Sequence, residues 1–287
     1  MQSDNRLGEF LRARREVARP EDFGLPEPGR RRTPGLRREE VALLAGVSAD
    51  YYVRLEQGRD KHPSDQVIDA LARVYTLNDD GVAHLRELAR PAARPRRRSR
   101  QPERVSPALL RLLDLWPDTP ALVVGRHLDV LANNRIAAAL NHCSTKGQNM
   151  VRATFLEPYT RRVYADWPRV AAETVASLRA SAGTDLDDPR LTELVGELSL
   201  KSDDFRRLWA RHDVAAKTAG TKRFDHPMVG DLTLSYETFT VNGAPGQQLL
   251  VYHAAPDTPS AQALTLLGSI AADQRIRTPM ASDQQSR

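Results

Sequence analysis

A chain of 287 residues can form one large domain or two ordinary ones, each with its own buried core. Hydrophobic residues make up 40% and charged residues 28%, which is typical of a soluble globular protein, and no apolar run reaches the roughly 18–20 residues of a membrane span. The whole net charge of +5 lies in residues 1–104, which hold 22 Lys or Arg against 17 Asp or Glu; this part suits a polyanionic partner, although a solvated basic surface would show the same excess.

The only cysteine, Cys143, can form no internal disulfide, and residues 1–10 lack the apolar segment of a secretory signal. Both observations favour a reducing cytoplasm, next to the nucleoid if the chain binds DNA. Cys143 lies in the polar stretch 142–148, so we expect an exposed thiol without a function, with a redox switch as the alternative.

The first part of the chain is expected to consist of short helices. Apolar residues three and four apart predict one helix around residues 7–14 and four more over 39–45, 49–57, 66–75 and 80–88. Residues 91–104 are rich in Pro and Arg and predict an extended linker. We therefore expect a first domain over 1–92, a basic linker over 93–104, a second domain over 105–274 and a polar tail over 275–287.

The second domain has a mixed α and β pattern. Short alternating runs predict strands over 121–124, 128–131, 232–241 and 248–253. Helices are expected over 109–116, 135–141, 159–182, 190–200, 203–211 and 260–272.

Residues 37–58 have the pattern of a helix-turn-helix. Ala42 is small where a second helix must approach, Gly46 can supply the positive φ of the turn, and Ser48 can cap the next helix. We expect Val41, Leu44, Tyr52 and Leu55 to face the core. The run Arg54-Leu55-Glu56-Gln57-Gly58-Arg59 and the wider pattern over 6–77 resemble the phage-repressor, Xre-type, family. That resemblance implies an all-α domain whose second motif helix enters the major groove of double-stranded operator DNA.

The outward side of this helix carries the expected base-reading residues. Arg54 can pair with guanine, Asp50 can accept from a cytosine amino group, and Ala49 can touch a thymine methyl. Two alternatives stay open: Arg54 contacts a phosphate, or Asp50 only stabilises the helix N-terminus. The residues expected to contact the DNA backbone are Arg37, Arg38, Ser48, Tyr51, Arg59, Lys61 and Ser64, although Tyr51 can equally pack inside.

Two further features concern charge. By its position in the family pattern, Glu56 points inward and pairs with Arg15 as a structural ion pair. The stretch 18–35 is longer than the family's usual connection and contains Arg30, Arg31 and Arg32. This basic loop can contact an adjacent groove or backbone of DNA, or it can simply be solvated.

The second domain resembles that of MmyB-like regulators, which join an Xre-type helix-turn-helix to a PAS-like ligand-binding domain. The matching runs are Asp118–Ala121, Asp129–Asn134, Phe155–Pro158, Tyr164–Trp167, Ser202–Trp209 and Phe224–Pro227. The resemblance implies an α+β fold, with an antiparallel sheet and helices enclosing an apolar cavity for a small, largely apolar, fatty-acid-like effector. The aromatic candidates for its lining, all of which core packing explains equally well, are Phe155, Trp167, Trp209, Phe224, Tyr236 and Phe239.

The sequence therefore predicts a homodimeric, effector-responsive transcription regulator and not an enzyme. No phosphate-binding glycine loop, nucleophile elbow or paired metal-ligand spacing occurs, so we expect no catalytic residue, metal or cofactor, and no membrane partner. The alternatives are an enzyme or a partner-recruiting protein that carries a DNA-targeting helix-turn-helix.

Overall fold

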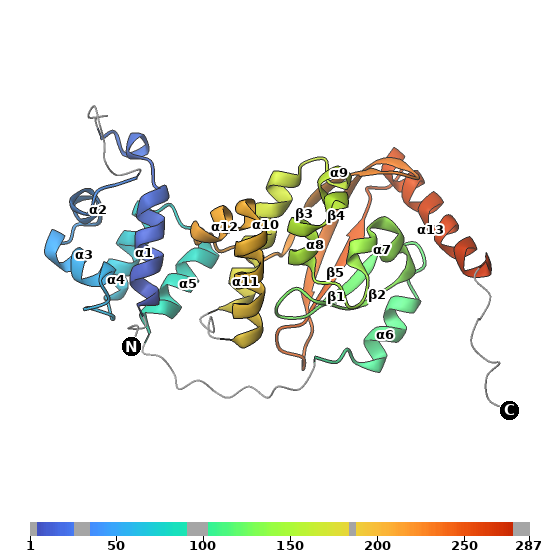
Figure 1. Cartoon of the computed structure of the whole chain (residues 1–287), viewed down its shortest axis with the longest axis horizontal. Coiled ribbons are helices and arrows are strands. Elements are labelled where there is room, and N and C mark those ends of the chain that lie inside the picture. Colours follow the sequence, from blue (N-terminus) through green and yellow to red (C-terminus); the bar gives the residue numbers. More distant parts are fainter. Residues whose placement is uncertain (1–4, 26–34, 91–102, 184–187, 278–287) are drawn as a thin grey trace. The chain divides into compact units, whose positions relative to one another are not determined.

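The computed structural model describes residues 5–25, 35–90, 103–183 and 188–277, and these divide into two compact units (Figure 1). Unit 1 comprises residues 1–99, 175–193 and 203–216, and unit 2 comprises the other residues. Two segments that we assigned to the second domain thus belong to unit 1. Arg30, Arg31 and Arg32, most of the linker and most of the tail lie outside the described residues.

Unit 1 is helical, as the sequence predicts. Its N-terminal part consists of α1 (Arg6–Val17), the short 3-10 helix η1 (Pro20–Phe23), α2 (Arg38–Ala45), α3 (Ala49–Glu56), α4 (Asp65–Val74) and α5 (Asp79–Ala89). Four of these helices begin after a residue whose side chain accepts a backbone N–H of the first turn, namely Asn5, Ser48, Ser64 and Asn78. The segments from later in the chain add the second part of α10 (Trp167–Ala182), the start of α11 (Pro189–Lys201) and α12 (Asp203–Ala210).

The core of unit 1 lies between these helices. Val41, Tyr52 and Leu55 are fully buried in it, as expected. The expectation for Leu44 is wrong, because this side chain is 36% exposed. Helix α2 buries Val41 and Ala42 instead, and only the neighbouring Ala45 of its last turn packs against the same core.

Unit 2 contains an antiparallel sheet with helices, which confirms the expected α+β fold. Its strands are β1 (Ala121–Val124), β2 (Val130–Asn133), β3 (Ala219–His226), β4 (Gly230–Thr240) and β5 (Gln248–His253), in the order β2-β1-β5-β4-β3. Strand β3 was not predicted, and β2 begins two residues later than expected. The register places Lys222 opposite Leu234, Gly220 opposite Tyr236, and Tyr236 opposite Tyr252.

The two faces of this sheet are covered by different helices. Helix α6 (Pro107–Asp114) packs its Leu113 against Ala121, Val123 and Leu249 on one face. The remaining helices of unit 2 are α7 (Arg135–Leu140), the 3-10 helix η2 (His142–Ser144), α8 (Met150–Leu156), α9 (Pro158–Val163), the start of α10, the end of α11 and α13 (Pro259–Arg277). The single helix expected over 159–182 is wrong: α9 ends at Val163, and Tyr164 forms a β-bridge with Phe224 before α10 begins.

Asn134 explains one of the sequence runs on which the resemblance depends. Its side-chain oxygen accepts the N–H of Ala137 in the first turn of α7, at 3.1 Å, and the N–H of Ala121 in β1, at 3.0 Å. Its amide nitrogen donates to the carbonyls of Trp116 and Thr119. This one buried side chain joins α7, β1 and the segment after α6, so its role here is structural.

Candidate nucleic-acid interface and internal cavity

The turn between α2 and α3 has the geometry that a helix-turn-helix requires. Gly46 adopts φ +68°, and the N–H of Val47 donates to the carbonyl of Ala42 at 2.9 Å. Ser48 accepts the N–H of Tyr51 at 3.2 Å, so its hydroxyl caps α3. Helix α3 therefore begins at a fixed place relative to α2.

The outward edge of α3 carries the three residues expected to read bases. Ala49 is exposed, the Asp50 side chain is 95% exposed, and the Arg54 side chain is 46% exposed. Arg54 lies 3.8 Å from the Asp50 carboxylate and 5.6 Å from the centroid of the Tyr51 ring. The structure thus brings these residues together on one accessible edge, with the guanidinium held loosely by two neighbours.

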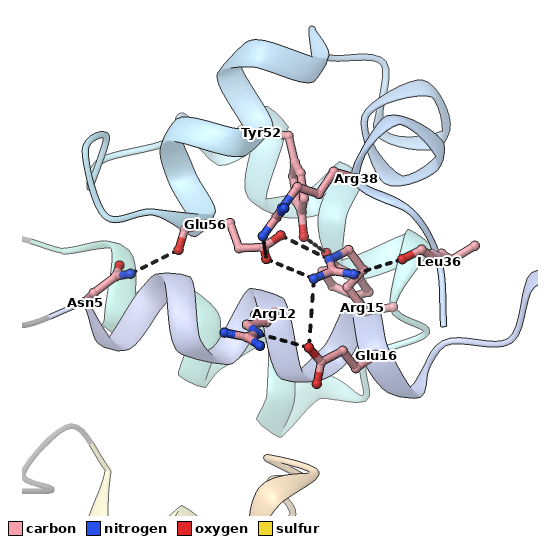
Figure 2. A network of polar contacts seen from close by, with 9 residues as sticks. Asn5, Arg12, Arg15, Glu16, Leu36, Arg38, Tyr52 and Glu56 are labelled. Carbon is pink, nitrogen blue, oxygen red and sulfur yellow. Dashed lines mark hydrogen bonds and ion pairs between the residues drawn. The ribbon is translucent and has the colours of Figure 1, made fainter. Parts of the chain in front are cut away.

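Glu56, at the other end of α3, is the centre of a polar network (Figure 2). Arg15 of α1 donates two hydrogen bonds to its carboxylate, at 2.9 and 3.0 Å, and a third to the carbonyl of Leu36. Arg38 donates to the same carboxylate at 3.0 Å, and Asn5 donates to the backbone carbonyl of Glu56. The pair of Arg15 and Glu56 is present as the resemblance implies, and Arg38 makes it a network of three charges.

The charges in this network shift its pKa values. Burial alone would raise the pKa of Glu56, but the hydrogen bonds from Arg15 and Arg38 outweigh burial and hold it below its ordinary value. Burial alone would lower the pKa of Arg15, but its hydrogen bond and charge interaction with Glu56 outweigh burial and raise this pKa above its ordinary value. Glu56 is therefore a carboxylate at neutral pH, and it fixes α1, α3 and the start of α2 against one another.

The residues expected to contact the DNA backbone lie on both sides of α3. Arg37, Arg59, Lys61 and Ser64 are exposed, and the Ser64 hydroxyl accepts the N–H of Val67 at the start of α4. Arg38 differs from the others, because its side chain is tied to Glu56 while 44% of it stays exposed. Tyr51 is partly buried against the core, which leaves both of its expected roles open.

Sequence reasoning missed a buried hydrogen bond between two tyrosines behind the helix-turn-helix. The hydroxyls of Tyr52 on α3 and Tyr75 after α4 lie 2.6 Å apart, and both side chains are buried. Burial raises the pKa of both hydroxyls well above the ordinary value. The only signal in the sequence was a tyrosine at a helical core position, which does not reveal its partner.

Unit 2 contains a small cavity on the sheet face opposite α6. Its lining comes from β1, β3, β5, α7 and the segments after α7 and α9: Leu122, Ala137, Leu140, Asn141, Ser144, Tyr164, Phe224 and Tyr252. The Asn141 amide donates to the Tyr164 hydroxyl at 2.9 Å. The lining is thus mostly apolar and aromatic with a few polar groups, and the cavity volume of about 10 Å³ is that of about one water molecule.

The six aromatic candidates lie in different places. Phe224 lines the cavity, and Tyr236 lies beside it with its ring centroid 5.9 Å from that of Tyr252. Phe155 and Trp167 pack edge-to-face against each other and are buried. Trp209 belongs to unit 1, where it stacks on Phe205, and Phe239 is 53% exposed, so neither lines this cavity.

Two lysines beside the cavity were not predicted. Lys222 lies on the inward side of β3 and is only 1% exposed, with its amine 5.2 Å from the ring centroid of Tyr164 and 5.7 Å from that of Tyr236. Lys217, which is partly exposed, brings its amine within 4.9 Å of the same Tyr236 ring. Burial, and then the charge of Lys217, lowers the pKa of Lys222 well below its ordinary value, and burial also lowers that of Lys217.

The expectation of an exposed Cys143 is wrong. The thiol is buried, and burial, with the charge of Glu157 as a smaller cause, raises its pKa to about 11. In the described parts of the chain, no cluster of three His, Cys, Asp or Glu side chains could hold a metal ion. The helices described there also include none with the length and apolar character needed to cross a membrane.

Comparisons with known proteins give two family matches. The model of the MmyB-like transcription regulator ligand binding domain matches residues 105–267, which is more than half of the chain. A helix-turn-helix domain model matches residues 6–85. No curated protein matches the chain.

Proposed function

Because the chain belongs to the family of the MmyB-like transcription regulator ligand binding domain, we propose that it is a homodimeric regulator that reads operator DNA with α3 and responds to a small, largely apolar effector. The family matched by residues 105–267 is one of transcription regulators, and the helix-turn-helix match supports a DNA-binding transcription regulator as the general function. The dimer, the operator and the effector are the proposed parts.

One observation carries this proposal: the edge of α3 formed by Ala49, Asp50 and Arg54 is accessible while the opposite side of the helix is buried. The exposed ion pair between Arg54 and Asp50 is worth about 0.2–1 kcal/mol. A bidentate contact of Arg54 with guanine would contribute about 1–3 kcal/mol of discrimination. Arg54 can therefore leave Asp50 for a base at little cost.

The dimer follows from how such helices read DNA. One helix contacts only a few base pairs, so two copies about one helical turn apart are needed to specify an operator, which is then nearly palindromic. An effector in the cavity of unit 2 would act by binding more tightly to one arrangement of the dimer and shifting the population toward it.

DNase footprinting with the purified full-length protein tests the proposal. We expect protection of a site upstream of a regulated gene, in two halves about one helical turn apart. Absence of a protected site upstream of any gene, at modest salt, would contradict it.

Arg54→Ala tests the reading edge itself. We expect the variant to lose roughly 5–150-fold in affinity for the operator, equivalent to the 1–3 kcal/mol above, and to keep weak binding to random DNA. Arg207→Ala, which removes an exposed arginine of α12, is the matched control and should bind as the wild type does. An equal loss on operator and random DNA would show that Arg54 contacts phosphate and not a base.

A further inference from the structure

Helix α6 of unit 2 exposes several leucines. Its Leu113 is buried against the sheet, but Leu110 is 42% exposed, Leu112 is 36% exposed, and Leu115, the residue after the helix, is 74% exposed. Single exposed leucines are common in soluble proteins, whereas several on one short helix form an apolar patch, and such patches mark interaction surfaces.

The sheet beside α6 adds to this patch. Phe239 of β4 lies directly opposite Leu249 of β5, and Leu249 belongs to the cluster into which Leu113 of α6 packs. Because residues opposite each other in a sheet share a face, Phe239 lies on the face that α6 covers, and it is 53% exposed. Val241, which follows β4, packs partly buried against the same cluster. One face of unit 2 thus carries exposed apolar side chains on α6 and on β4.

Helix α6 also carries one positive and one negative charge without a counter-charge. Arg111 and Asp114 are exposed, and neither forms an ion pair with another described residue. They lie equally far, in sequence, from the midpoint between residues 112 and 113, and so do Leu110 and Leu115. Read in the opposite direction, the segment therefore places leucine where leucine was and the opposite charge where each charge was.

We propose that a second copy of this chain covers this face, with the α6 helices of the two copies packed antiparallel about a twofold axis. A twofold axis makes every contact occur twice with the roles exchanged. Leu110 then packs against the partner's Leu115, and Arg111 pairs with the partner's Asp114. This match of the helix with itself favours a second copy over a different protein. The inference names the interface of the homodimer and rests on the proposed function.

The size of the interface explains why the sheet takes part. Helix α6 has eight residues and is about 12 Å long, so two such helices alone bury less than the roughly 800 Å² per copy of a stable interface. Phe239 and Val241 on the same face supply further apolar area. We therefore expect the helix pair to form the centre of the contact and the end of β4 to extend it.

Exchange of the two charges tests the pairing in the full-length protein. Arg111→Asp would bring two acidic side chains together at each of the two contacts, and Asp114→Arg would bring two basic ones together. Analytical ultracentrifugation over a range of concentrations should show that each variant raises the dimer dissociation constant at least about tenfold. An equal mixture of the two variants should dimerise as the wild type does, because a mixed dimer restores both pairs of opposite charge. Native mass spectrometry identifies the mixed dimer.

Leu115→Glu tests the apolar part of the contact. Burying the new carboxylate against the partner's Leu110 is costly, so we expect the dimer dissociation constant to rise at least about tenfold. The circular dichroism spectrum should stay unchanged, since the side chain is exposed in the single chain. Leu200→Glu is the matched control: Leu200 of α11 is 87% exposed and also belongs to unit 2, and this variant should dimerise as the wild type does.

Two results would overturn the interface while leaving the dimer of the proposed function in place. In the first, the wild type is a dimer and none of the three variants weakens it, so that another occupant or solvent covers the face. In the second, the charge variants weaken the dimer but their mixture does not restore it. A wild type that stays monomeric at every concentration and on operator DNA would instead contradict the homodimer itself.

Discussion

At the scale of single residues, Glu56 has the greatest structural effect. Its carboxylate is shared by Arg15 and Arg38, and its own backbone carbonyl accepts the side chain of Asn5. Asn5 also caps α1, and a Cβ on Gly58 would lie 2.3 Å from the Asn5 side chain. The end of α3 and the start of α1 are therefore fitted together around this residue.

Glu56→Ala should destabilise unit 1 by roughly 3–5 kcal/mol, because it leaves the buried Arg15 guanidinium without its carboxylate. Urea unfolding followed by circular dichroism measures this loss. Asp69→Ala is the matched control: it removes a 45% exposed carboxylate that pairs with Arg86 outside this network, and should cost about 0–1 kcal/mol. Equal, small effects of both variants would show that the network does not stabilise the unit.

At the scale of elements, β3 is a strand that the local sequence pattern does not predict. Its three buried positions hold Lys222, Phe224 and His226, so the alternation of apolar and polar residues that predicts a strand is missing. The strand forms because its backbone pairs with β4 along eight residues, and the buried His226 ring forms a hydrogen bond with the carbonyl of Ala139. Such long-range partners are not visible in a local pattern.

The helix-turn-helix could be predicted because its constraints are local. A small residue at Ala42, a positive φ at Gly46 and a cap at Ser48 all act within a few positions of one another. The surroundings of Lys217 and Lys222 could not be predicted, because the Tyr236 and Tyr164 rings that contact their amines come from β4 and from the segment after α9.

A prediction for β3 follows from the cost of its buried amine. In the absence of ligand, Lys222→Met should raise the stability of unit 2 by about 1–3 kcal/mol, because a thioether chain of similar size replaces a polar group buried without an ion pair. Differential scanning calorimetry of the full chain measures the change. A lower midpoint than that of the wild type would mean that Lys222 stabilises the empty fold.

At the scale of the whole molecule, unit 1 is assembled from three separate stretches of chain. Arg14 of α1 forms an ion pair with Asp213, and Val214 is buried in the same core as the helix-turn-helix. The ring of Phe10 lies 5.6 Å from His84 and 6.3 Å from His212. Residues distant in sequence thus complete the unit that carries α3.

The two histidines make the stability of unit 1 dependent on pH. Burial, and then the charge of Arg179, lowers the pKa of His84 to about 4 and that of His212 to about 3. Their contribution is complete above the ordinary histidine pKa of 6.5 and is lost as the pH falls from there toward 4, because the unfolded chain binds the protons.

We therefore expect the thermal midpoint of unit 1 to fall between pH 7.5 and pH 4.5, and His84→Phe to reduce that fall. His253→Gln, at an exposed position of β5, is the control and should leave the pH dependence unchanged. Calorimetry at several pH values measures both. An identical fall in wild type and His84→Phe would show that His84 is not the titrating group.

The attachment of Arg38 to Glu56 has a consequence for how binding to DNA responds to salt. Each cation that neutralises a phosphate releases counterions and steepens the log–log dependence of affinity on salt by about 0.9. Arg38 is held by its hydrogen bond to Glu56 at 3.0 Å, so while this bond persists it does not neutralise a phosphate and releases no counterion from the DNA. The slope of log affinity against log salt concentration should therefore include contributions from Arg37, Arg59 and Lys61 but none from Arg38, although Arg38 lies on the same surface.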